Sequence, residues 1–161
     1  MKIILVTGTP GTGKTALAKN LAQKLNFLYL DVNKLISKNN LSEGYDKKRK
    51  SKIVDANKLA KSLIKEINFI KKYKKINKIK NQKKIKGVII DSHLSHYLPG
   101  RYANLCIVAK CDIKELSARL KKKRFHKEKI AENLQAEIFD ICHNEALERK
   151  HNVLVIDTSK R

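Results

Sequence analysis

The residues best suited to chemistry form one short segment, Gly8–Thr15, whose sequence is GTPGTGKT. It satisfies the pattern G-x-x-x-x-G-K-[ST] at every specified position. Glycines let backbone N–H groups approach an anion closely, and the start of a following helix adds a favourable dipole. Lys14 can then reach the β- and γ-phosphates, and the Thr15 hydroxyl can take a Mg²⁺ position. The segment predicts a nucleotide-phosphate site, because a plain strand-to-helix turn needs neither side chain.

A second candidate group lies where an apolar run ends at Asp91 and is followed by His93 and His96. A carboxylate at a strand end, across the sheet edge from Thr15, would hold Mg²⁺ directly or through its water. An Asp that only caps the next turn is the alternative. At His93 a neutral imidazole would position the attacking water or the acceptor phosphate, or serve structurally. Two histidines and one carboxylate also make a candidate zinc set, which this spacing does not favour.

A transfer reaction also needs an acceptor pocket and groups that exclude water. Within 31–54, Tyr45 can stack on a base and Lys38 can reach a phosphate, although both side chains also suit an open surface. Three basic residues near the end of a later helix can neutralise charge on a transferred phosphoryl group, and they are Arg119, Lys123 and Arg124. A solvated basic helix end is the alternative.

The elements that must position these groups alternate as short apolar runs and amphipathic stretches. The runs predict strands at Ile3–Val6, Phe27–Leu30, Val88–Asp91, Asn104–Ala109 and Val153–Ile156. Helices are expected around 17–25, 31–40 and 55–79, from a capping pattern at Asp112, and from about 127 to 141 as one helix. A polar loop is expected at 42–51. Strands that alternate with helices predict one α/β domain over 1–161, with five parallel strands whose C-terminal ends form the ligand-binding edge.

The net charge of the 161 residues is unusual, at +22 from 37 basic and 15 acidic residues. From Lys47 to Lys86 there are 17 basic and 2 acidic residues. A basic patch for nucleic acid is one explanation, and a codon bias that enriches Lys, Ile and Asn is the other. The sequence has no apolar run of the roughly 20 residues that cross a bilayer. Its three cysteines lack paired spacing, so we expect a soluble cytoplasmic protein without a disulfide framework or a zinc site.

Several segments, taken together and in order, resemble the adenylate kinase isoenzyme 6 family of nuclear and archaeal nucleoside-monophosphate kinases. They are Gly8–Thr15, Asp31–Leu35, Gly44–Asp46, Ile53–Asp55, Asp91–His93, Arg119–Leu120 and Asn133–Ile138. Position by position, the residues that match the ATP loop are Gly11, Gly13, Lys14, Thr15 and Ala16. Asp91 and His93 match the D-x-H motif of that family, and Asp31 begins the stretch that matches its monophosphate lobe.

The resemblance implies a P-loop NTPase core of the nucleoside monophosphate kinase type. It places a monophosphate-binding lobe at 31–54 and a short lid at 123–133. It implies reversible phosphoryl transfer from Mg-ATP to AMP, together with ATP hydrolysis. It also implies a role in late maturation of the small ribosomal subunit and its rRNA, through a platform ribosomal protein.

Two departures from the family concern the lid and a basic insertion. The lid arginine of the family falls on Lys123, while Arg124 stands where the family usually has Gly; a slip of one residue would give Arg124 the role. The stretch 68–86 is longer than expected and rich in lysine, which makes it a candidate rRNA-binding segment. The alternatives to a kinase of AMP are an ATPase switch that binds a ribosomal protein or rRNA, and a P-loop kinase of another small metabolite.

Overall fold

The computed structural model describes residues 1–46, 51–79 and 85–160. Five strands form a parallel sheet in the order β2 (Leu28–Asp31), β5 (Gly87–Asp91), β1 (Lys2–Thr7), β6 (Leu105–Lys110) and β7 (Val153–Asp157). All five lie within a residue or so of the predicted runs. The α/β class and the parallel five-stranded sheet are therefore confirmed. Because the strands are parallel, the loop after β1 and the turn after β5 meet at the same edge.

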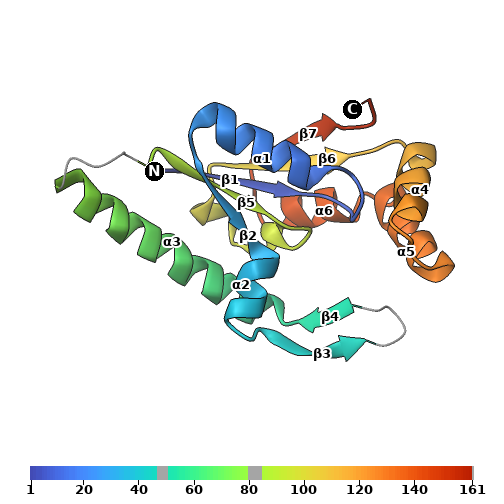
Figure 1. Cartoon of the computed structure of the whole chain (residues 1–161), viewed down its shortest axis with the longest axis horizontal. Coiled ribbons are helices and arrows are strands. Elements are labelled where there is room, and N and C mark those ends of the chain that lie inside the picture. Colours follow the sequence, from blue (N-terminus) through green and yellow to red (C-terminus); the bar gives the residue numbers. More distant parts are fainter. Residues whose placement is uncertain (47–50, 80–84, 161) are drawn as a thin grey trace.

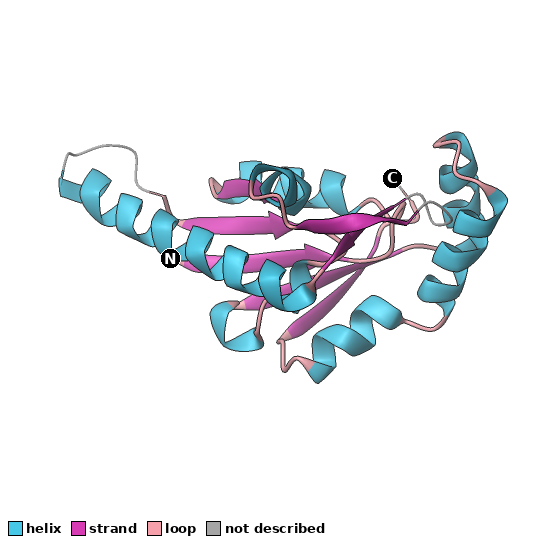
Figure 2. Ribbon diagram, turned by 90° about the horizontal axis from the view of Figure 1, so that it is seen from below, coloured by secondary structure: helices cyan, strands magenta, loops and turns pink. Residues whose placement is uncertain are grey.

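Helices cover both faces of this sheet (Figures 1 and 2). Alternation along β1 sends Ile4 and Val6 towards α1 (Lys14–Leu25), and Ile3 and Leu5 into a larger cluster on the opposite face. That cluster takes its helical side chains mainly from α3 (Ala56–Ile79) and α2 (Val32–Lys38), with a smaller contribution from α6 (Ile141–Glu148). Two short 3₁₀ turns, η1 (Ser95–Tyr97) and η2 (Gly100–Tyr102), follow β5. In the described residues no helix is long and apolar enough to cross a membrane.

Two sequence predictions about local structure were wrong. The stretch expected as a polar loop forms an antiparallel ribbon of β3 (Ser42–Asp46) and β4 (Ser51–Val54), which follows α2 (Val32–Lys38). Its side chains are mostly exposed, so no apolar alternation marks the strands. The single helix expected from 127 to 141 is divided into α5 (Lys127–Ile138) and α6, because Asp140 adopts φ 54°. A left-handed residue ends the α-helical hydrogen-bond pattern.

A helical hairpin extends from the sheet beside the cavities described below. Asp112 caps α4 (Ile113–Lys122) as predicted, since its carboxylate accepts hydrogen bonds from the N–H groups of Lys114 (2.9 Å) and Glu115 (3.1 Å). Leu116 and Leu120 are fully buried, and an apolar cluster joins α4 to α5. The hairpin and the β3–β4 ribbon flank the C-terminal edge of the sheet (Figure 1). The edge is therefore bordered by two projecting units, in the places where a lid and an acceptor lobe are expected.

Candidate functional site

The loop between β1 and α1 is held in an anion-binding conformation by its own contacts. Gly8 has φ 140°, and a Cβ built there would lie 2.4 Å from the carbonyl oxygen of Ala109. Thr12 closes a turn, because its N–H and its hydroxyl both donate to the Thr9 carbonyl, at 3.2 Å and 2.9 Å. The Thr158 hydroxyl, from the segment after β7, contacts the Thr12 carbonyl. The loop is thus preorganised from both sides, with the start of α1 directly behind it.

A central cavity of about 260 Å³ lies between this loop and the end of β5. Lys14 and Thr15 line it from α1, and Asp91 and His93 line it from the turn after β5. Burial lowers the pKa of the Lys14 ammonium, while the Asp91 carboxylate acts in the opposite direction and stabilises the cation. The structure therefore brings the two candidate groups of the sequence into one cavity.

Asp91, which lines this cavity, has one carboxylate oxygen without a hydrogen-bond partner among the described residues. Its side chain is buried, and Oδ2 accepts a hydrogen bond from the Tyr29 hydroxyl at 2.7 Å. Oδ1 has no hydrogen-bond partner among the described residues. A buried carboxylate oxygen without a partner is costly unless a cation or a proton compensates for it. Together with the Thr15 hydroxyl on the same cavity, it gives two hard oxygen ligands, which suit Mg²⁺ carried by a substrate phosphate.

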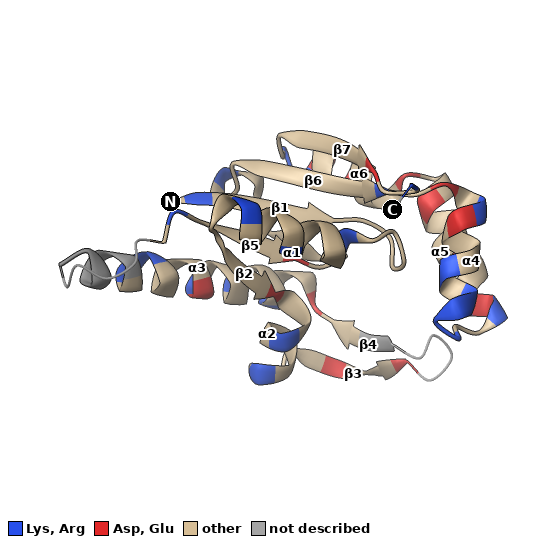
Figure 3. Cartoon of the chain, turned by 45° about the horizontal axis from the view of Figure 1, so that its top comes forward, with Lys and Arg blue, Asp and Glu red and all other residues tan. Residues whose placement is uncertain are grey.

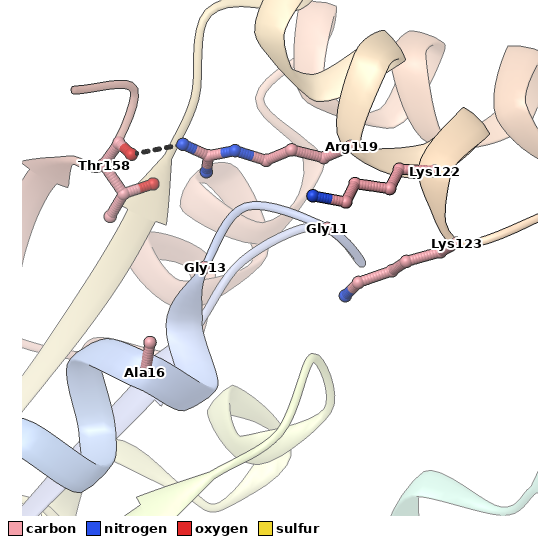
Figure 4. Close-up of a pocket in the computed structure, with 7 residues that line it drawn as sticks. All are labelled: Gly11, Gly13, Ala16, Arg119, Lys122, Lys123 and Thr158. Atoms are coloured by element: carbon pink, nitrogen blue, oxygen red, sulfur yellow. Dashed lines mark hydrogen bonds between the residues drawn. The ribbon is translucent and has the colours of Figure 1, made fainter. Parts of the chain in front are cut away.

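A second cavity of about 420 Å³ adjoins the first on the side of the helical hairpin. Figure 4 shows Arg119, Lys122 and Lys123 extending from α4 and the residue after it, opposite Gly11 and Gly13 of the loop. Arg119 is fixed by hydrogen bonds to the carbonyl oxygens of Thr158 (2.8 Å) and Ser159 (3.1 Å) and to Glu115 (2.7 Å). Ala16 completes the wall from α1. The cavity therefore combines cations with glycine backbone, as a nucleoside triphosphate requires.

A third cavity, of about 330 Å³, adjoins the first on the side of the β3–β4 ribbon. It is lined by side chains from α2, the ribbon, the turn after β5 and α5, namely Asn33, Ile36, Ser37, Val54, His93, Leu94 and Lys129. Asn33 and His93 line both this cavity and the central one, and Gly11 and Lys123 line both the central cavity and the second one. The three cavities form one continuous cleft with the phosphate-binding loop in the middle.

The two histidines after β5 have different roles. Burial lowers the pKa of His93 to about 4, with the charge of Lys14 as the next contribution, so the ring is neutral at pH 7. His96 is fully buried and joins β1 to α6, with Nδ1 2.7 Å from the Thr7 hydroxyl and Nε2 2.7 Å from Glu145 Oε2. His96 is thus engaged away from the cleft. The described residues contain no group of three or more His, Cys, Asp or Glu side chains placed to hold a metal.

Lys123 and Arg124 are the two candidates for the lid cation, and they differ in geometry. Lys123 ends α4 and lines two of the three cavities. Arg124 is exposed, adopts φ 58° and lines none of these cavities. A left-handed residue directly after a helix is the position that favours Gly. The geometry thus assigns the cleft-facing cation to Lys123.

The acceptor residues suggested by the sequence are only partly brought together. Asp31 lines the central cavity and caps α2, where its carboxylate accepts from the N–H of Asn33 at 2.9 Å. Lys38 is exposed at the end of α2, and the Tyr45 side chain on β3 is 58% exposed. Neither of them lines any of these three cavities.

Among the residues that sequence reasoning missed, two have a clear effect on the cleft. Lys129 enters the third cavity from α5, and its charge is close enough to contribute to the lowered pKa of His93. Nothing in the sequence distinguishes it from the other lysines of a lysine-rich chain. Tyr29 orients the Asp91 carboxylate from the neighbouring strand β2. The position of Tyr29 in the second apolar run could have been used to find it, because side chains alternate between the two faces of a strand and the position therefore fixes the face on which the ring lies.

Comparison with known proteins adds a family to this geometry. A profile of the AAA domain family matches residues 4–140. A Pyrococcus furiosus protein, provisionally named adenylate kinase, is 35% identical to this chain. The match covers 98% of this chain and 75% of that protein. Two proteins named adenylate kinase isoenzyme 6 homolog also match. That of Caenorhabditis elegans is 30% identical over 90% of this chain and 72% of its own length, and that of Saccharomyces cerevisiae is 33% identical over 96% and 71%.

Solved structures show the same fold at low sequence identity. A sugar kinase from Janibacter has a TM-score of 0.61 at 16% identity, over 98% of this chain and 85% of that chain. The protein TT1252 from Thermus thermophilus has a TM-score of 0.53 at 16% identity, over 98% and 88%. These similarities concern the fold alone.

Proposed function

The chain belongs to the adenylate kinase isoenzyme 6 family, and from this premise we propose that it transfers a phosphoryl group reversibly between Mg-ATP and AMP. Its general class is that of a nucleotide kinase with a P-loop fold. The observation that carries the proposal is the continuous cleft of three cavities, with the phosphate-binding loop at its centre. The second cavity, on the donor side, and the third cavity, on the opposite side, suit transfer of a phosphoryl group between two bound molecules.

On the donor side, the chain supplies positioning and positive charge. Lys14 brings its ammonium group to the phosphates, and Lys123 faces them from the end of α4. The base and ribose of ATP occupy the second cavity, beside Arg119 and Gly13. Mg²⁺, held by the Thr15 hydroxyl and Asp91, supplies neutralisation of charge on the phosphate oxygens. Arg119 and Asp91 are already held by hydrogen bonds, so little reorganisation of these two groups is needed as charge develops.

On the acceptor side, AMP occupies the third cavity with its phosphate directed to the central one. Lys129 supplies the positive charge, and Asn33 supplies an amide that can donate to a phosphate oxygen. The neutral ring of His93 lies at the junction of the two cavities and can hydrogen-bond either the AMP phosphate or a water molecule. When AMP is absent, water at this junction attacks instead, which gives ATP hydrolysis as a second activity.

The test compares ADP formation from Mg-ATP with and without AMP. Strong stimulation by AMP, with two ADP formed for each AMP consumed, is expected. Indifference to AMP would exclude the proposal and favour the ATPase-switch alternative. A panel of other nucleoside monophosphates and small hydroxyl-bearing metabolites separates AMP from other acceptors, because P-loop kinases share a donor site and differ in the acceptor lobe.

Membership of the family supports a second proposal, a cytoplasmic role in late maturation of the small ribosomal subunit. The chain would bind a platform ribosomal protein, with rRNA close to the basic stretch 68–86. Of that stretch, residues 80–84 lie outside the described residues, while Asn68–Tyr73 continue α3 with exposed lysines. Co-sedimentation with purified small subunits, compared with and without ATP, tests this role.

A further inference from the structure

One exposed face of α3 carries lysines and aromatic rings that take no part in the cleft. These residues recur at helical spacings of three and four, and they are Lys58, Lys61, Lys65, Phe69, Lys72 and Tyr73; we call them the α3 lysine face. All six are exposed. From the first to the last, the face extends about 22 Å along the helix. The carboxylate of Glu43, on β3, forms an ion pair with Lys58 at one end. Lys61, Lys65 and Lys72 are in no ion pair that the structure shows among its described residues.

The N-terminal half of this face borders a polar cavity of about 410 Å³. Lys58, Lys61 and Lys65 line one wall of it, and Asn39 and Leu41 line the other. The Asn39 amide donates to the Ser62 hydroxyl at 2.8 Å, so the floor is polar and ordered. The ammonium groups of Lys61 and Lys65, which have no ion-pair partner among the described residues, suit a phosphate group beside this polar hollow, and no part of the proposed kinase reaction uses the cavity.

The C-terminal half of the face presents aromatic rings instead. Phe69 is 65% exposed and Tyr73 is 47% exposed, one helical turn apart. Aromatic side chains beside lysines are a common platform for unpaired bases, because every base has a face that can stack.

From this combination we propose that the α3 lysine face binds single-stranded RNA. Phosphates would lie along Lys61 and Lys65 and in the cavity beside them, and bases would stack on Phe69 and Tyr73. An acidic protein segment would satisfy the lysines but has no comparable use for two exposed rings. Duplex nucleic acid keeps its bases stacked internally, so it cannot use the rings either.

The C-terminal half of the face is remote from the nucleotide cleft, and none of the six residues lines its three cavities. The C-terminal part of α3 runs past the start of β1 (Figures 1, 2 and 3). The central cavity lies at the opposite ends of the strands, where the loop after β1 and the end of β5 line it. RNA and nucleotides can therefore be bound at the same time. The inference rests on the proposed function only in its choice of RNA over DNA. RNA binding by the α3 lysine face and the proposed kinase function can therefore fail separately.

The experiment measures binding of a fluorescein-labelled RNA of about twelve nucleotides to the full chain by anisotropy, from roughly 50 to 200 mM KCl. Three phosphate contacts predict a slope of log K against log salt of about −2. The double variant Lys61→Gln/Lys65→Gln is expected to bind about tenfold more weakly and to have a slope smaller by about 1.4. The matched control, Lys24→Gln/Lys114→Gln, removes two exposed lysines elsewhere and should bind like the original chain.

The aromatic step is tested with Phe69→Leu and Tyr73→Leu, which keep an apolar side chain and remove the ring. Each is expected to weaken binding about tenfold. Unchanged RNA affinity in both aromatic variants, together with a lower affinity in the lysine double variant, would overturn the proposal. The face would then be a purely electrostatic surface that an acidic peptide could also occupy. Equal affinity for duplex RNA, equal losses in the matched control, or no binding at the lowest salt would also overturn it. Kinase activity measured on the same samples shows whether the proposed function stands independently.

Discussion

The neutral state of His93 makes a prediction about stability that can be measured without any substrate. Its pKa is about 4 in the folded chain, against 6.5 for an ordinary histidine, and burial is the main cause. Between these values the unfolded chain binds a proton that the folded chain does not, so the free energy of unfolding must fall as pH decreases from about 6.5 to about 4. A difference of 2.5 pKa units corresponds to about 3 kcal/mol when the whole range is crossed.

The assay is urea unfolding at a series of pH values for the original chain and for His93→Gln. Other groups titrate in the same range, so the informative quantity is the difference between the two free energies of unfolding. We expect the original chain to lose about 3 kcal/mol relative to the variant on going from pH 7 to pH 4. Parallel curves for the original chain and His93→Gln would refute the reasoning, because they would mean that His93 protonates equally well in both states.

Three further predictions concern the cleft. Asp91→Asn should raise the Mg²⁺ concentration needed for half-maximal activity by at least about tenfold, because it removes the charge from the buried oxygen ligand; an unchanged Mg²⁺ titration would argue against that ligand. Lys123→Met should raise the KM for ATP by about tenfold, whereas Arg124→Gly should leave it unchanged; the reverse order would move the lid role to Arg124. Lys129→Met should raise the KM for AMP and leave the KM for ATP unchanged, and equal effects on both would exclude an acceptor-side role.

The parts that the sequence predicted well depend on local pattern. The five strands are short and apolar, and the capping pattern at Asp112 is complete within four residues. The loop at Gly8–Thr15 combines glycines, Lys14 and Thr15 in a spacing that few other structures require. Each of these signals acts within one element or one turn, so tertiary structure has little opportunity to override it.

The parts that the sequence could not supply depend on contacts between distant segments. The choice between Lys123 and Arg124 depends on how the end of α4 lies beside the cavities, because Lys123 lines two of them while Arg124, in the left-handed conformation after the helix, lines none of the three. Lys129 becomes important only because α5 packs beside the turn after β5. The β3–β4 ribbon escaped notice because neither of its faces is buried, so the period-two pattern that reveals most strands is missing.

The high positive charge of the chain has two separate structural meanings. Lys14, Lys123 and Lys129 converge on one cleft, where Lys14 and Lys129 are partly buried, which strengthens their interaction with phosphate and limits screening by salt. The lysines of α3 stand on an open helix, where each contributes little alone and only a polyanion that spans several of them gains substantial affinity. Composition could not separate these groups, because both appear in it as lysine. Their difference lies in burial and convergence, and for that reason the cleft suits a small nucleotide while the helix suits a long, flexible chain of phosphates.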